Sequence, residues 1–393
     1  MSFSAFPLPP LTTLFPISTI AKPEHFFASL SWIGHMQYRQ LGRSELSVSV
    51  VCLGSWSIAT KDFFWDNRQR ADSLATVHAA LAAGINFFDT APAYGEGDAE
   101  EILGEALAGR RREVVVATKV RPTDLEPDRL RASCETSLRA LRTDYIDLLQ
   151  IHWPNHAIPL EPTCRAMEDL CREGKVCYLG VSNFGASYLD ELAQLERQVG
   201  KRGQSPCAGK KGDSPPFPTV ASNQVPYSLL WRAIEYDIQP RCVERQIGIL
   251  CYSPLHQALL SGKFATADDV PEKRARSRLF SSRRAMTRHG EPGFEAETFA
   301  ALAEIRRLAA EVGQPMGRLA IAWLLAQPGV TAAIVGARNA AQAAENAAAG
   351  ELALDSEVAA RLSAITDPLK QLLGRNADPW EHISRMERPT AAG

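Results

Sequence analysis

The arrangement of hydrophobic residues along the chain constrains its fold more than any other feature. From residue 48 onward, short apolar runs alternate with longer segments whose apolar residues recur at helical spacing. Such alternation is typical of βα repeats with parallel strands, and near-continuous hydrophobicity is typical of strands buried on both faces. Eight runs fit this description: residues 48–53, 85–88, 114–118, 146–151, 176–181, 221–225, 248–251 and 332–335.

The segments between these runs carry the stripes of amphipathic helices. Leu130, Cys134 and Leu138 form one such stripe, which begins after Pro127. Proline is favoured in the first turn of a helix, where its missing N–H group needs no partner. We therefore expect a helix after each strand.

Eight parallel strands that are each followed by a helix can close into a barrel. We predict an α/β fold, a (β/α)8 TIM barrel with a short N-terminal hairpin at residues 36–47 and a C-terminal helical extension at residues 367–393. A doubly wound open sheet is the competing architecture. No G-x-G-x-x-G turn follows the first run, however, as the dinucleotide site of that architecture would require.

Length, charge and cysteine content limit the function classes. A chain of 393 residues with 45% hydrophobic residues can bury one large core, so we predict a single domain at residues 36–366. The formal net charge of −2 does not favour nucleic acid or an anionic membrane as partner, and no apolar run reaches the ~18 residues of a membrane span. The eight cysteines form no C-x-x-C pair, so we interpret them as reduced core residues of a cytoplasmic protein with a small-molecule substrate.

Three segments depart from the βα rhythm. Residues 1–35 are rich in Pro, Ser, Thr and Phe, and we predict a disordered tail; a targeting segment and a misassigned start codon are the alternatives. Residues 201–218 are polar and rich in Gly and Pro, which predicts a disordered surface insertion. Residues 264–293 carry a basic run that we interpret as a solvated loop, with a lid near an anionic cofactor as the alternative.

Polar side chains with catalytic potential follow the apolar runs, one run after another. The second, third and fourth runs lead into Asp89, Lys119 and His152, and later runs lead into Asn183 and Tyr252. Because the carboxyl ends of barrel strands converge on one mouth, we expect these side chains to meet there. Each of them alone has an ordinary structural explanation, such as a turn carboxylate or a lysine that reaches solvent. Their joint placement therefore carries the inference.

Four residues form a chemically coherent set for the reduction of a carbonyl. A carbonyl that accepts hydride becomes an alkoxide and needs a proton, which the hydroxyl of Tyr94 can supply if its pKa, about 10 in water, is lowered. Lys119 would lower this pKa by stabilising the phenolate, and Asp89 would keep Lys119 charged and in place. His152 would donate a hydrogen bond to the carbonyl oxygen.

The motifs around these residues resemble those of the aldo/keto reductase superfamily, in particular its branch of bacterial aldo/keto reductases and potassium-channel β subunits. The matching stretches are MQYRQLGRSELSVS, INFFDTAPAYG, VVVATKV, DLLQIHWP, GVSNF, SNQVPYSLL, CYSPL and IVGARNAAQAAEN. They occur in family order between residues 36 and 366. The resemblance assigns the catalytic roles to Asp89, Tyr94, Lys119 and His152, and it implies an NADPH-dependent oxidoreductase that interconverts carbonyls and alcohols.

The resemblance also implies where NADPH or NADP+ would bind. Ser182, Asn183 and Gln224 would hold the nicotinamide carboxamide, and Tyr252 would stack on the ring. Arg338 would take the 2′-phosphate, which favours NADPH over NADH, although a single Arg can also cap a helix or face solvent. The other implied cofactor contacts are Gly54, Ser55, Trp56, Ser253, Leu255, Lys263, Gly336, Gln342, Glu345 and Asn346.

The sequence predicts only part of the substrate pocket. Trp56, Trp65 and Trp153, together with Phe63 and Phe64, lie in expected loops at the mouth of the barrel. They would line an aromatic cleft that suits aldehydes and compact ketones, or they would pack as core beneath the loops.

Two rival functions stay open on the sequence. A subunit that senses the redox state of a cofactor could share this fold and keep the same four residues with little turnover. A different barrel enzyme, such as a lyase or an isomerase, is the other rival. The sequence lacks clusters of metal ligands, however, and the pairing of Tyr94 with Lys119 would then have no explanation.

Overall fold

The computed structural model describes residues 36–61, 69–199 and 220–389. The chain divides into two units, Met1–Gly34 and His35–Gly393. The first unit, and with it the predicted tail, lies outside the described residues. The predicted insertion at residues 201–218 also lies outside them.

Eight parallel strands form a closed barrel, which confirms the predicted fold class. The strand order is β10-β3-β4-β5-β6-β7-β8-β9, so the last strand closes the sheet against the first. Each of the eight apolar runs overlaps one barrel strand. The strands are β3 (Val51–Gly54), β4 (Phe87–Asp89), β5 (Val115–Val120), β6 (Ile146–Ile151), β7 (Val176–Ser182), β8 (Ser222–Pro226), β9 (Gly248–Tyr252) and β10 (Val330–Gly336).

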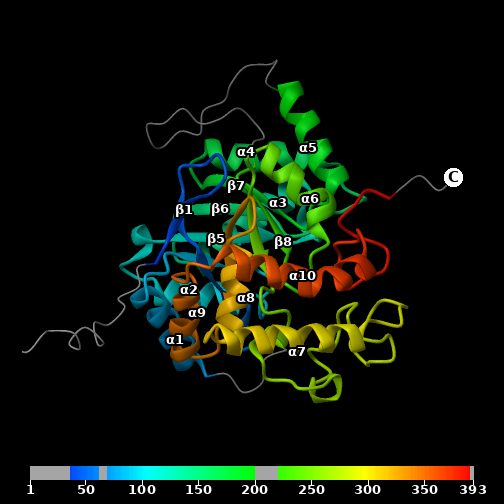
Figure 1. The fold of residues 1–393 in the computed structure, drawn as a ribbon. Coiled ribbons are helices and arrows are strands. Elements are labelled where there is room, and N and C mark those ends of the chain that lie inside the picture. Colours follow the sequence, from blue (N-terminus) through cyan, green and yellow to red (C-terminus); the bar gives the residue numbers. More distant parts are fainter. Residues whose placement is uncertain (1–35, 62–68, 200–219, 390–393) are drawn as a thin grey trace, which may run out of the picture. The chain divides into compact units, whose positions relative to one another are not determined.

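Helices surround the barrel on its outer side (Figure 1). Their bounds are α1 (Arg70–Ala82), α2 (Asp98–Ala106), α3 (Pro127–Ala140), α4 (Leu160–Arg172), α5 (Ala186–Val199), α6 (Ile234–Glu244), α7 (Glu295–Glu311), α8 (Met316–Leu325), α9 (Ala340–Ala349) and α10 (Ser356–Leu373). Pro127 stands in the first turn of α3, as expected. Helices α1 and α9 pack side by side, and so do α7 and α10 (Figure 1).

The alternation of side chains along the strands separates an inner core from an outer one. Phe87 on β4 and Leu148 on β6 belong to the cluster that fills the barrel. Their chain neighbours Phe88 and Leu149 belong to the larger cluster that holds the helices against the strands. Successive side chains of a strand face opposite sides, so a single apolar run supplies both cores.

A hairpin closes the amino-terminal end of the barrel, as predicted, but its strands differ from the prediction. β1 (Tyr38–Gln40) pairs antiparallel with β2 (Ser47–Ser49). The run at residues 48–53 is therefore shared between the hairpin and β3 and does not form one strand. Within this run the chain changes from antiparallel pairing in the hairpin to parallel pairing in the barrel. Leu41 and Val48 of the hairpin join the cluster that fills the barrel, so the hairpin plugs this end.

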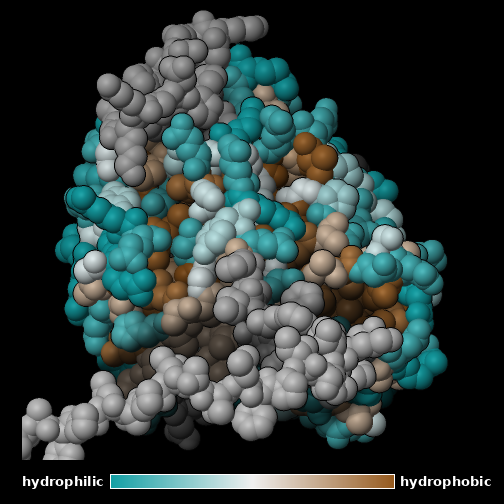
Figure 2. All heavy atoms as spheres, turned by 60° about the vertical axis from the view of Figure 1, so that its left-hand side comes forward, coloured by the Kyte–Doolittle hydropathy of each residue, from teal (hydrophilic) through white to brown (hydrophobic). Residues whose placement is uncertain are grey.

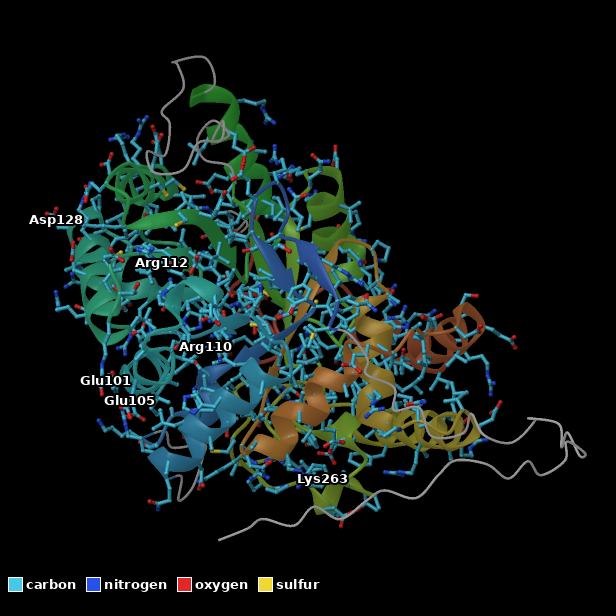
Figure 3. The ribbon with its side chains drawn as sticks, turned by 90° about the vertical axis from the view of Figure 1, so that its left-hand side faces the viewer. Glu101, Glu105, Arg110, Arg112, Asp128 and Lys263 are labelled. Atoms are coloured by element: carbon cyan, nitrogen blue, oxygen red, sulfur yellow. The ribbon has the colours of Figure 1, made fainter. Side chains whose placement is uncertain are left out.

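Charged side chains lie on the outside of the helical layer. Glu101 on α2 and Asp128 on α3 are exposed and project outward (Figure 3). On the face that Figure 2 shows, hydrophilic residues cover much of the described surface, and hydrophobic ones gather in patches between them. In the described part of the chain, no helix combines the length and the apolar composition that a membrane crossing needs.

The last described segment departs from the predicted helical extension. Helix α10 ends at Leu373, and residues 374–389 form turns and not a helix. The side chain of Asn376 accepts a hydrogen bond from the N–H of Asp378 at 2.9 Å, and that of Asp378 accepts one from the N–H of Trp380 at 3.0 Å. Such turns compete with helical hydrogen bonding, so the extension is helical only as far as α10.

The loop after β9 contains a buried histidine. His256 is 3% exposed, its Nε2 lies 3.0 Å from Ser277 Oγ, and its ring stacks on that of Trp231. Burial lowers the pKa of His256 from 6.5 to about 4. Between these two values the folded protein keeps the ring neutral, whereas the unfolded chain protonates it.

We predict that His256 makes the protein less stable as the pH falls from 6.5 to about 4. Because the pKa is lower in the folded state, the unfolded chain binds one more proton in this window, and the free energy of unfolding falls by about 1.4 kcal/mol per pH unit. Urea unfolding at pH 7 and pH 5 measures the effect. The loss of stability on acidification should be about 2 kcal/mol smaller in His256→Gln than in the wild type. An equal loss in both proteins would contradict this assignment.

Candidate active site

The carboxyl-terminal ends of the barrel strands carry a layer of polar side chains inside the barrel. On β4, Asp89 stands two residues after the inner residue Phe87, and on β5, Lys119 stands two residues after the inner residue Ala117. Side chains two positions apart share a face of a strand, so both polar groups turn into the barrel. The corresponding positions on β6, β8 and β9 hold Gln150, Gln224 and Tyr252.

Lys119 is fully buried and joins two of the predicted catalytic residues. Its Nζ donates hydrogen bonds to Asp89 Oδ1 at 2.6 Å, to the carbonyl oxygen of Thr90 at 2.8 Å and to Tyr94 OH at 3.2 Å. These three acceptors match the three N–H groups of an ammonium. The structure thus brings Asp89, Lys119 and Tyr94 into direct contact.

Tyr94 lies in the loop after β4, with aromatic rings on two sides. Its N–H donates a hydrogen bond to the carbonyl oxygen of Ala91 at 3.0 Å, which closes the turn that carries it. The ring of His152 meets the ring of Tyr94 edge-on, with centroids 5.9 Å apart. The indole ring of Trp56 lies 6.2 Å from the same phenol ring. All four predicted catalytic residues are therefore gathered in one place.

Burial and nearby charges set the protonation states of two of these groups. Burial alone would lower the pKa of Lys119, but the carboxylate of Asp89 and the contact with Tyr94 raise it above its ordinary value, so the ammonium stays charged. Burial, followed by the positive charges of Lys119 and Arg121, holds the pKa of His152 well below its usual range. The imidazole is therefore neutral near pH 7.

The pKa of Tyr94 shifts in the direction opposite to our prediction. Burial raises it above its ordinary value, and the positive charge of Lys119 offsets only part of that effect. The sequence identified the neighbouring cation but held no measure of desolvation. The phenol is thus protonated near neutral pH, and the ammonium is placed to stabilise a phenolate once a proton has left.

Two buried glutamines hold the second oxygen of the Asp89 carboxylate. Gln224 Nε2 donates to Asp89 Oδ2 at 2.7 Å, and Gln150 Nε2 donates to the same atom at 3.3 Å. Gln150 is fully buried and was missed by the sequence analysis. Its place two residues before His152, on the inward face of β6, is the signal that could have found it.

A cavity of about 600 Å³ adjoins this polar layer. Asp89, Tyr94 and His152 line one end of it, while Lys119 lies behind them and is not among the residues that line it. Trp153, predicted for the substrate pocket, lines the cavity as well. Trp65, Phe63 and Phe64 lie outside the described residues.

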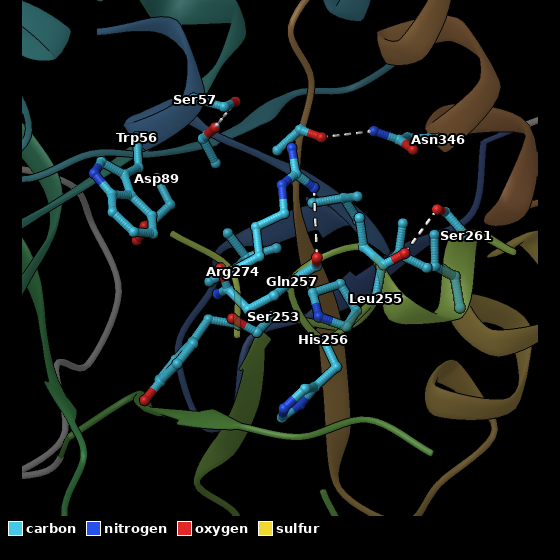
Figure 4. A pocket seen from close by; sticks show the side chains of 18 of the residues that line it. Trp56, Ser57, Asp89, Ser253, Leu255, His256, Gln257, Ser261, Arg274 and Asn346 are labelled. Atoms are coloured by element: carbon cyan, nitrogen blue, oxygen red, sulfur yellow. Dashed lines mark hydrogen bonds between the residues drawn. The ribbon is translucent and has the colours of Figure 1, made fainter. Parts of the chain in front are cut away.

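Nearly all of the predicted cofactor residues share this cavity. Figure 4 shows Trp56 on one side of it and Asn346 on the other. The predicted residues that line it are Gly54, Trp56, Ser182, Asn183, Gln224, Tyr252, Ser253, Leu255, Lys263, Gly336, Arg338, Gln342, Glu345 and Asn346.

Ser55 is the exception, and its predicted contact with the cofactor stays a prediction. It is fully buried and is not among the residues that line the cavity, whereas Trp56 and Ser57 are. These residues form a 3₁₀ turn, Ser55–Ile58. Successive side chains of such a turn point about 120° apart, so adjacent residues cannot all face one cavity.

A hydrogen-bond network fixes the residues predicted to hold the nicotinamide carboxamide. Asn183 Nδ2 donates to the carbonyl oxygen of His152 and to Ser182 Oγ, both at 3.0 Å. Ser182 Oγ donates to the carbonyl oxygen of Gln224 at 2.9 Å, and Tyr252 OH donates to Asn183 Oδ1 at 2.9 Å. These bonds hold each side chain in one orientation at the cavity wall.

Among the described residues, cations outnumber acids in the lining of the cavity. The acidic lining residues are Asp89 and Glu345. Such an excess of positive charge suits an anionic ligand, because guanidinium groups match the geometry of phosphate and carboxylate. The cationic lining residues are Lys263, Arg274, Arg276, Arg288, Arg318, Arg338 and Arg385.

The basic segment at residues 264–293 contributes several of these cations. Arg274, Arg276 and Arg288 line the cavity, which favours the alternative of a loop near an anionic ligand over a purely solvated loop. Arg278 has a different role, because it forms an ion pair with Glu291 at 2.8 Å. Composition alone could not separate the two kinds of arginine.

The sequence analysis also missed lining residues from the chain's last described segment. Trp380 and Arg385 line the cavity, although residues 374–389 show no strand or helix periodicity. Only the folded structure brings this segment beside Trp153, over whose ring the guanidinium of Arg385 lies at 4.1 Å.

Known proteins of one family match most of the chain. The family model described as Aldo/keto reductase family matches residues 50–367. The chain is similar to Aldo-keto reductase YhdN of Bacillus subtilis (strain 168), with 32% identity over 328 residues, which cover 78% of this chain and 86% of the relative. It is also similar to a probable voltage-gated potassium channel subunit beta of Oryza sativa subsp. japonica, with 31% identity over 322 residues, 79% of this chain and 90% of the relative.

A solved structure matches the fold over a similar extent. The aldo-keto reductase from Klebsiella pneumoniae in complex with NADPH superposes with a TM-score of 0.63 and 29% identity. The match covers 84% of this chain and 95% of that structure. Together, these similarities confirm the resemblance to bacterial aldo/keto reductases and potassium-channel β subunits that the motifs indicated.

We predict that Lys119→Met destabilises the protein by about 3–5 kcal/mol, because it leaves the carboxylate of Asp89 buried without a cation. Asp89→Asn combined with Lys119→Met removes both charges and should recover at least half of the lost free energy. Urea denaturation of the wild type and the two variants measures these values. A double variant that is no more stable than the single one would show that the unpaired carboxylate is not the cause.

Proposed function

The chain belongs to the aldo/keto reductase family, and from this premise we propose that it is an NADP-dependent oxidoreductase that reversibly reduces an aldehyde or ketone to an alcohol, with Tyr94 as the proton donor. One observation carries the proposal. A single buried ammonium, that of Lys119, contacts both the Asp89 carboxylate and the Tyr94 hydroxyl at the end of a cavity. That arrangement suits a phenol that must lose and regain a proton.

The side chains divide the work of proton transfer. Tyr94 donates its proton to the oxygen of the substrate carbonyl, and the resulting phenolate is stabilised by the ammonium of Lys119, 3.2 Å away. Asp89 keeps Lys119 charged and oriented through the 2.6 Å contact. In the reverse direction the phenolate takes the proton of the alcohol.

His152 assists as a neutral hydrogen-bond donor. Its lowered pKa keeps the ring uncharged, so it can polarise the carbonyl oxygen without competing as a stronger acid than the phenol. The edge-on contact of its ring with Tyr94 places both groups at the same end of the cavity. The carbonyl oxygen would therefore receive two donors.

The cavity fits a dinucleotide cofactor, which supplies hydride when it is bound in its reduced form. The excess of cationic side chains in the lining of the cavity provides counter-charges for phosphate groups. The hydrogen-bonded set of Ser182, Asn183 and Gln224 presents fixed polar groups to a carboxamide, and Tyr252 adds an aromatic face beside them. We assign the nicotinamide to this end because Asp89 and Tyr94 lie there.

Arg338 and Arg274 favour a 2′-phosphorylated cofactor. Burial, and then the positive charge of Arg338, lower the pKa of Arg274, which means that two guanidinium groups lie close enough to repel each other. Arg274 also donates to the carbonyl oxygen of Gln257 at 3.4 Å (Figure 4). A phosphate dianion beside both arginines would relieve the repulsion, so we propose that NADPH is preferred over NADH.

A regulatory subunit that binds the cofactor with little turnover is the second candidate. It is favoured by the similarity to the Oryza sativa potassium channel subunit beta. Steady-state oxidation of NADPH with a panel of aldehydes separates the two functions. Binding of NADPH without turnover would support the regulatory subunit.

We predict that Tyr94→Phe lowers kcat for aldehyde reduction by about 10²- to 10⁴-fold, because the variant lacks the proton donor. The Kd for NADPH should stay within about threefold of the wild type, since the cofactor contacts lie along the rest of the cavity. Steady-state kinetics and fluorescence titration measure the two quantities. Turnover at the wild-type rate would overturn the role assigned to Tyr94.

We predict that Arg338→Ala reduces the preference for NADPH over NADH by at least tenfold, through a higher KM for NADPH, since one charge-assisted contact to a phosphate is worth about 1.5–3 kcal/mol. The ratio of kcat/KM values for the two cofactors is the measurement. Arg283→Ala, from the same basic segment as Arg274 but not among the residues that line the cavity, is the control. An unchanged ratio in Arg338→Ala would remove this residue from the phosphate site.

A further inference from the structure

The side-chain amide of Gln224 can turn either of two chemically opposite ends to the cavity. One end is an NH₂ group, which donates hydrogen bonds, and the other is an oxygen, which accepts them. Gln224 is 2% exposed and lines the cavity together with Asp89 and Tyr94. The end that it presents therefore decides which ligand groups can bind at this part of the wall.

Asp89 decides the orientation of this amide. Its Oδ1 accepts a hydrogen bond from Lys119 Nζ at 2.6 Å, and its Oδ2 accepts one from Gln224 Nε2 at 2.7 Å. A carboxylate in an ion pair carries no hydrogen, so the group that faces Oδ2 must be a donor. Turning the amide over would place the Gln224 oxygen against a carboxylate oxygen and would lose a charge-assisted hydrogen bond.

A second glutamine keeps the other N–H of Gln224 inside the barrel. Gln224 Nε2 donates to Gln150 Oε1 at 3.5 Å, and Gln150 Nε2 donates to Asp89 Oδ2 at 3.3 Å. Gln150 is fully buried and is not among the residues that line the cavity. A Cβ atom at Gly180, its partner on the next strand, would lie 3.0 Å from Gln150 Cγ. The glycine thus leaves room for the Gln150 side chain.

The oxygen of the Gln224 amide is the end that is left for the cavity. Among the described residues, none donates a hydrogen bond to Gln224 Oε1. This atom is also not one of the buried side-chain atoms that lack a partner, so it reaches the open space of the cavity. The wall therefore presents a hydrogen-bond acceptor at this point, and the contact with Asp89 is the reason.

We propose that Asp89 has a second role as a positioning residue, in which it acts through Gln224 to make this part of the wall accept a hydrogen bond from the NH₂ group of the nicotinamide carboxamide. One carboxylate then serves both tasks, because its Oδ1 holds Lys119 and its Oδ2 holds Gln224. This inference rests on the cofactor assignment of the proposed function, since it assumes that the nicotinamide lies at this end of the cavity.

Asp89→Asn should reverse the polarity of the wall with little change in shape. Lys119 can only donate, so its ammonium takes the oxygen of the new amide. The NH₂ group of that amide then faces Gln224, whose oxygen must turn toward it. The NH₂ group of Gln224 is left for the cavity, so the wall changes from an acceptor to a donor.

The test compares two ligands of equal charge, NADP+ and its 3-acetylpyridine analogue, in which a methyl ketone replaces the carboxamide. The ketone keeps a carbonyl oxygen but has no N–H to donate. Loss of the Asp89 charge affects both ligands alike, so the ratio of their Kd values reports the polarity of the wall. Isothermal titration calorimetry of the full-length protein measures both values.

We expect the wild type to bind NADP+ about tenfold more tightly than the analogue, because the ketone leaves Gln224 Oε1 without a donor. In Asp89→Asn the ratio should fall to within about twofold of one, since both ligands can offer a carbonyl oxygen to the N–H groups of Gln224. A wild type that binds the two ligands equally well would overturn the proposal.

Gln150→Met is the matched control. Gln150 also donates to Asp89 Oδ2 and is also buried, but it does not line the cavity. The variant should keep the wild-type ratio, because the 2.7 Å contact of Gln224 with Asp89 is intact. A ratio that Gln150→Met lowers as much as Asp89→Asn does would show that general loosening of the site is the cause, and would refute the positioning role.

A double-variant cycle tests whether Asp89 acts through Gln224. Gln224→Met removes the polar group from the wall and should also bring the ratio close to one. Adding Asp89→Asn to that variant should change the ratio by less than about twofold, because the residue that transmits the effect is gone. A further change of tenfold would mean that Asp89 acts on the cofactor by another route.

Asp89→Asn leaves the charge of Lys119 buried without a carboxylate, so a second variant guards against a failure to fold. Asp89→Leu combined with Lys119→Met replaces the ion pair by apolar side chains, a change that proteins often tolerate. Gln224 then has no carboxylate to orient it, and the ratio should again fall toward one. Thermal unfolding of each variant checks its folding, and a wild-type ratio in this folded double variant would contradict the proposal.

Failure of the proposed function is distinguishable from failure of this inference. Binding of NADP+ without aldehyde turnover would refute the reductase and leave the comparison of ligands intact. If the wild type binds neither ligand, the cofactor assignment fails, and hydrogen exchange then judges the role of Asp89. In protein labelled with ¹⁵N-glutamine, the Nε2 hydrogens of Gln224 are identified by their loss in Gln224→Met. They should exchange at least about tenfold faster in Asp89→Asn than in the wild type, because they face the cavity there; equal rates overturn the inference.

Discussion

The buried ion pair of Lys119 and Asp89 is the interaction on which the mouth of the barrel depends. Removing two charges from water is costly, and their mutual attraction offsets that cost only when the remaining donors and acceptors are also satisfied. Lys119 meets this condition with three acceptors, and Asp89 meets it with the ammonium and two amide groups. The pair is therefore held in one arrangement, and the hydroxyl of Tyr94 is the third acceptor of the Lys119 ammonium.

Much of this could be predicted from the sequence because strand geometry is simple. A period of two along an apolar run decides which residue turns into the barrel, and the last inward position of β4 and of β5 holds Asp89 and Lys119. Eight such runs are enough to predict the closed sheet, and the closed sheet is enough to predict that the ends converge. The same rule, applied to β6, would have identified Gln150 beside the catalytic residues.

The features that the sequence analysis missed depend on contacts between distant segments or on the shape of short turns. Arg385 and Trp153 meet only after the whole barrel has closed, and nothing in residues 374–389 marks them as a cavity wall. The absence of Ser55 from the lining of the cavity agrees with the pitch of a 3₁₀ turn, which the motif did not show. The direction of the pKa shift of Tyr94 depends on how much water the folded protein removes, a quantity that no list of neighbours contains.

That last difference bears on how the site can work. A proton donor must keep its proton until negative charge develops on the substrate, and a phenol beside an unopposed ammonium would ionise too early. Burial raises the pKa of Tyr94 above its ordinary value, and the carboxylate of Asp89 opposes the lowering effect of Lys119. Asp378 offsets the charge of Arg385 in the same way, so an arginine lines the cavity as one member of an ion pair. Paired charges thus allow one small space to contain two cations and an acid that keeps its proton.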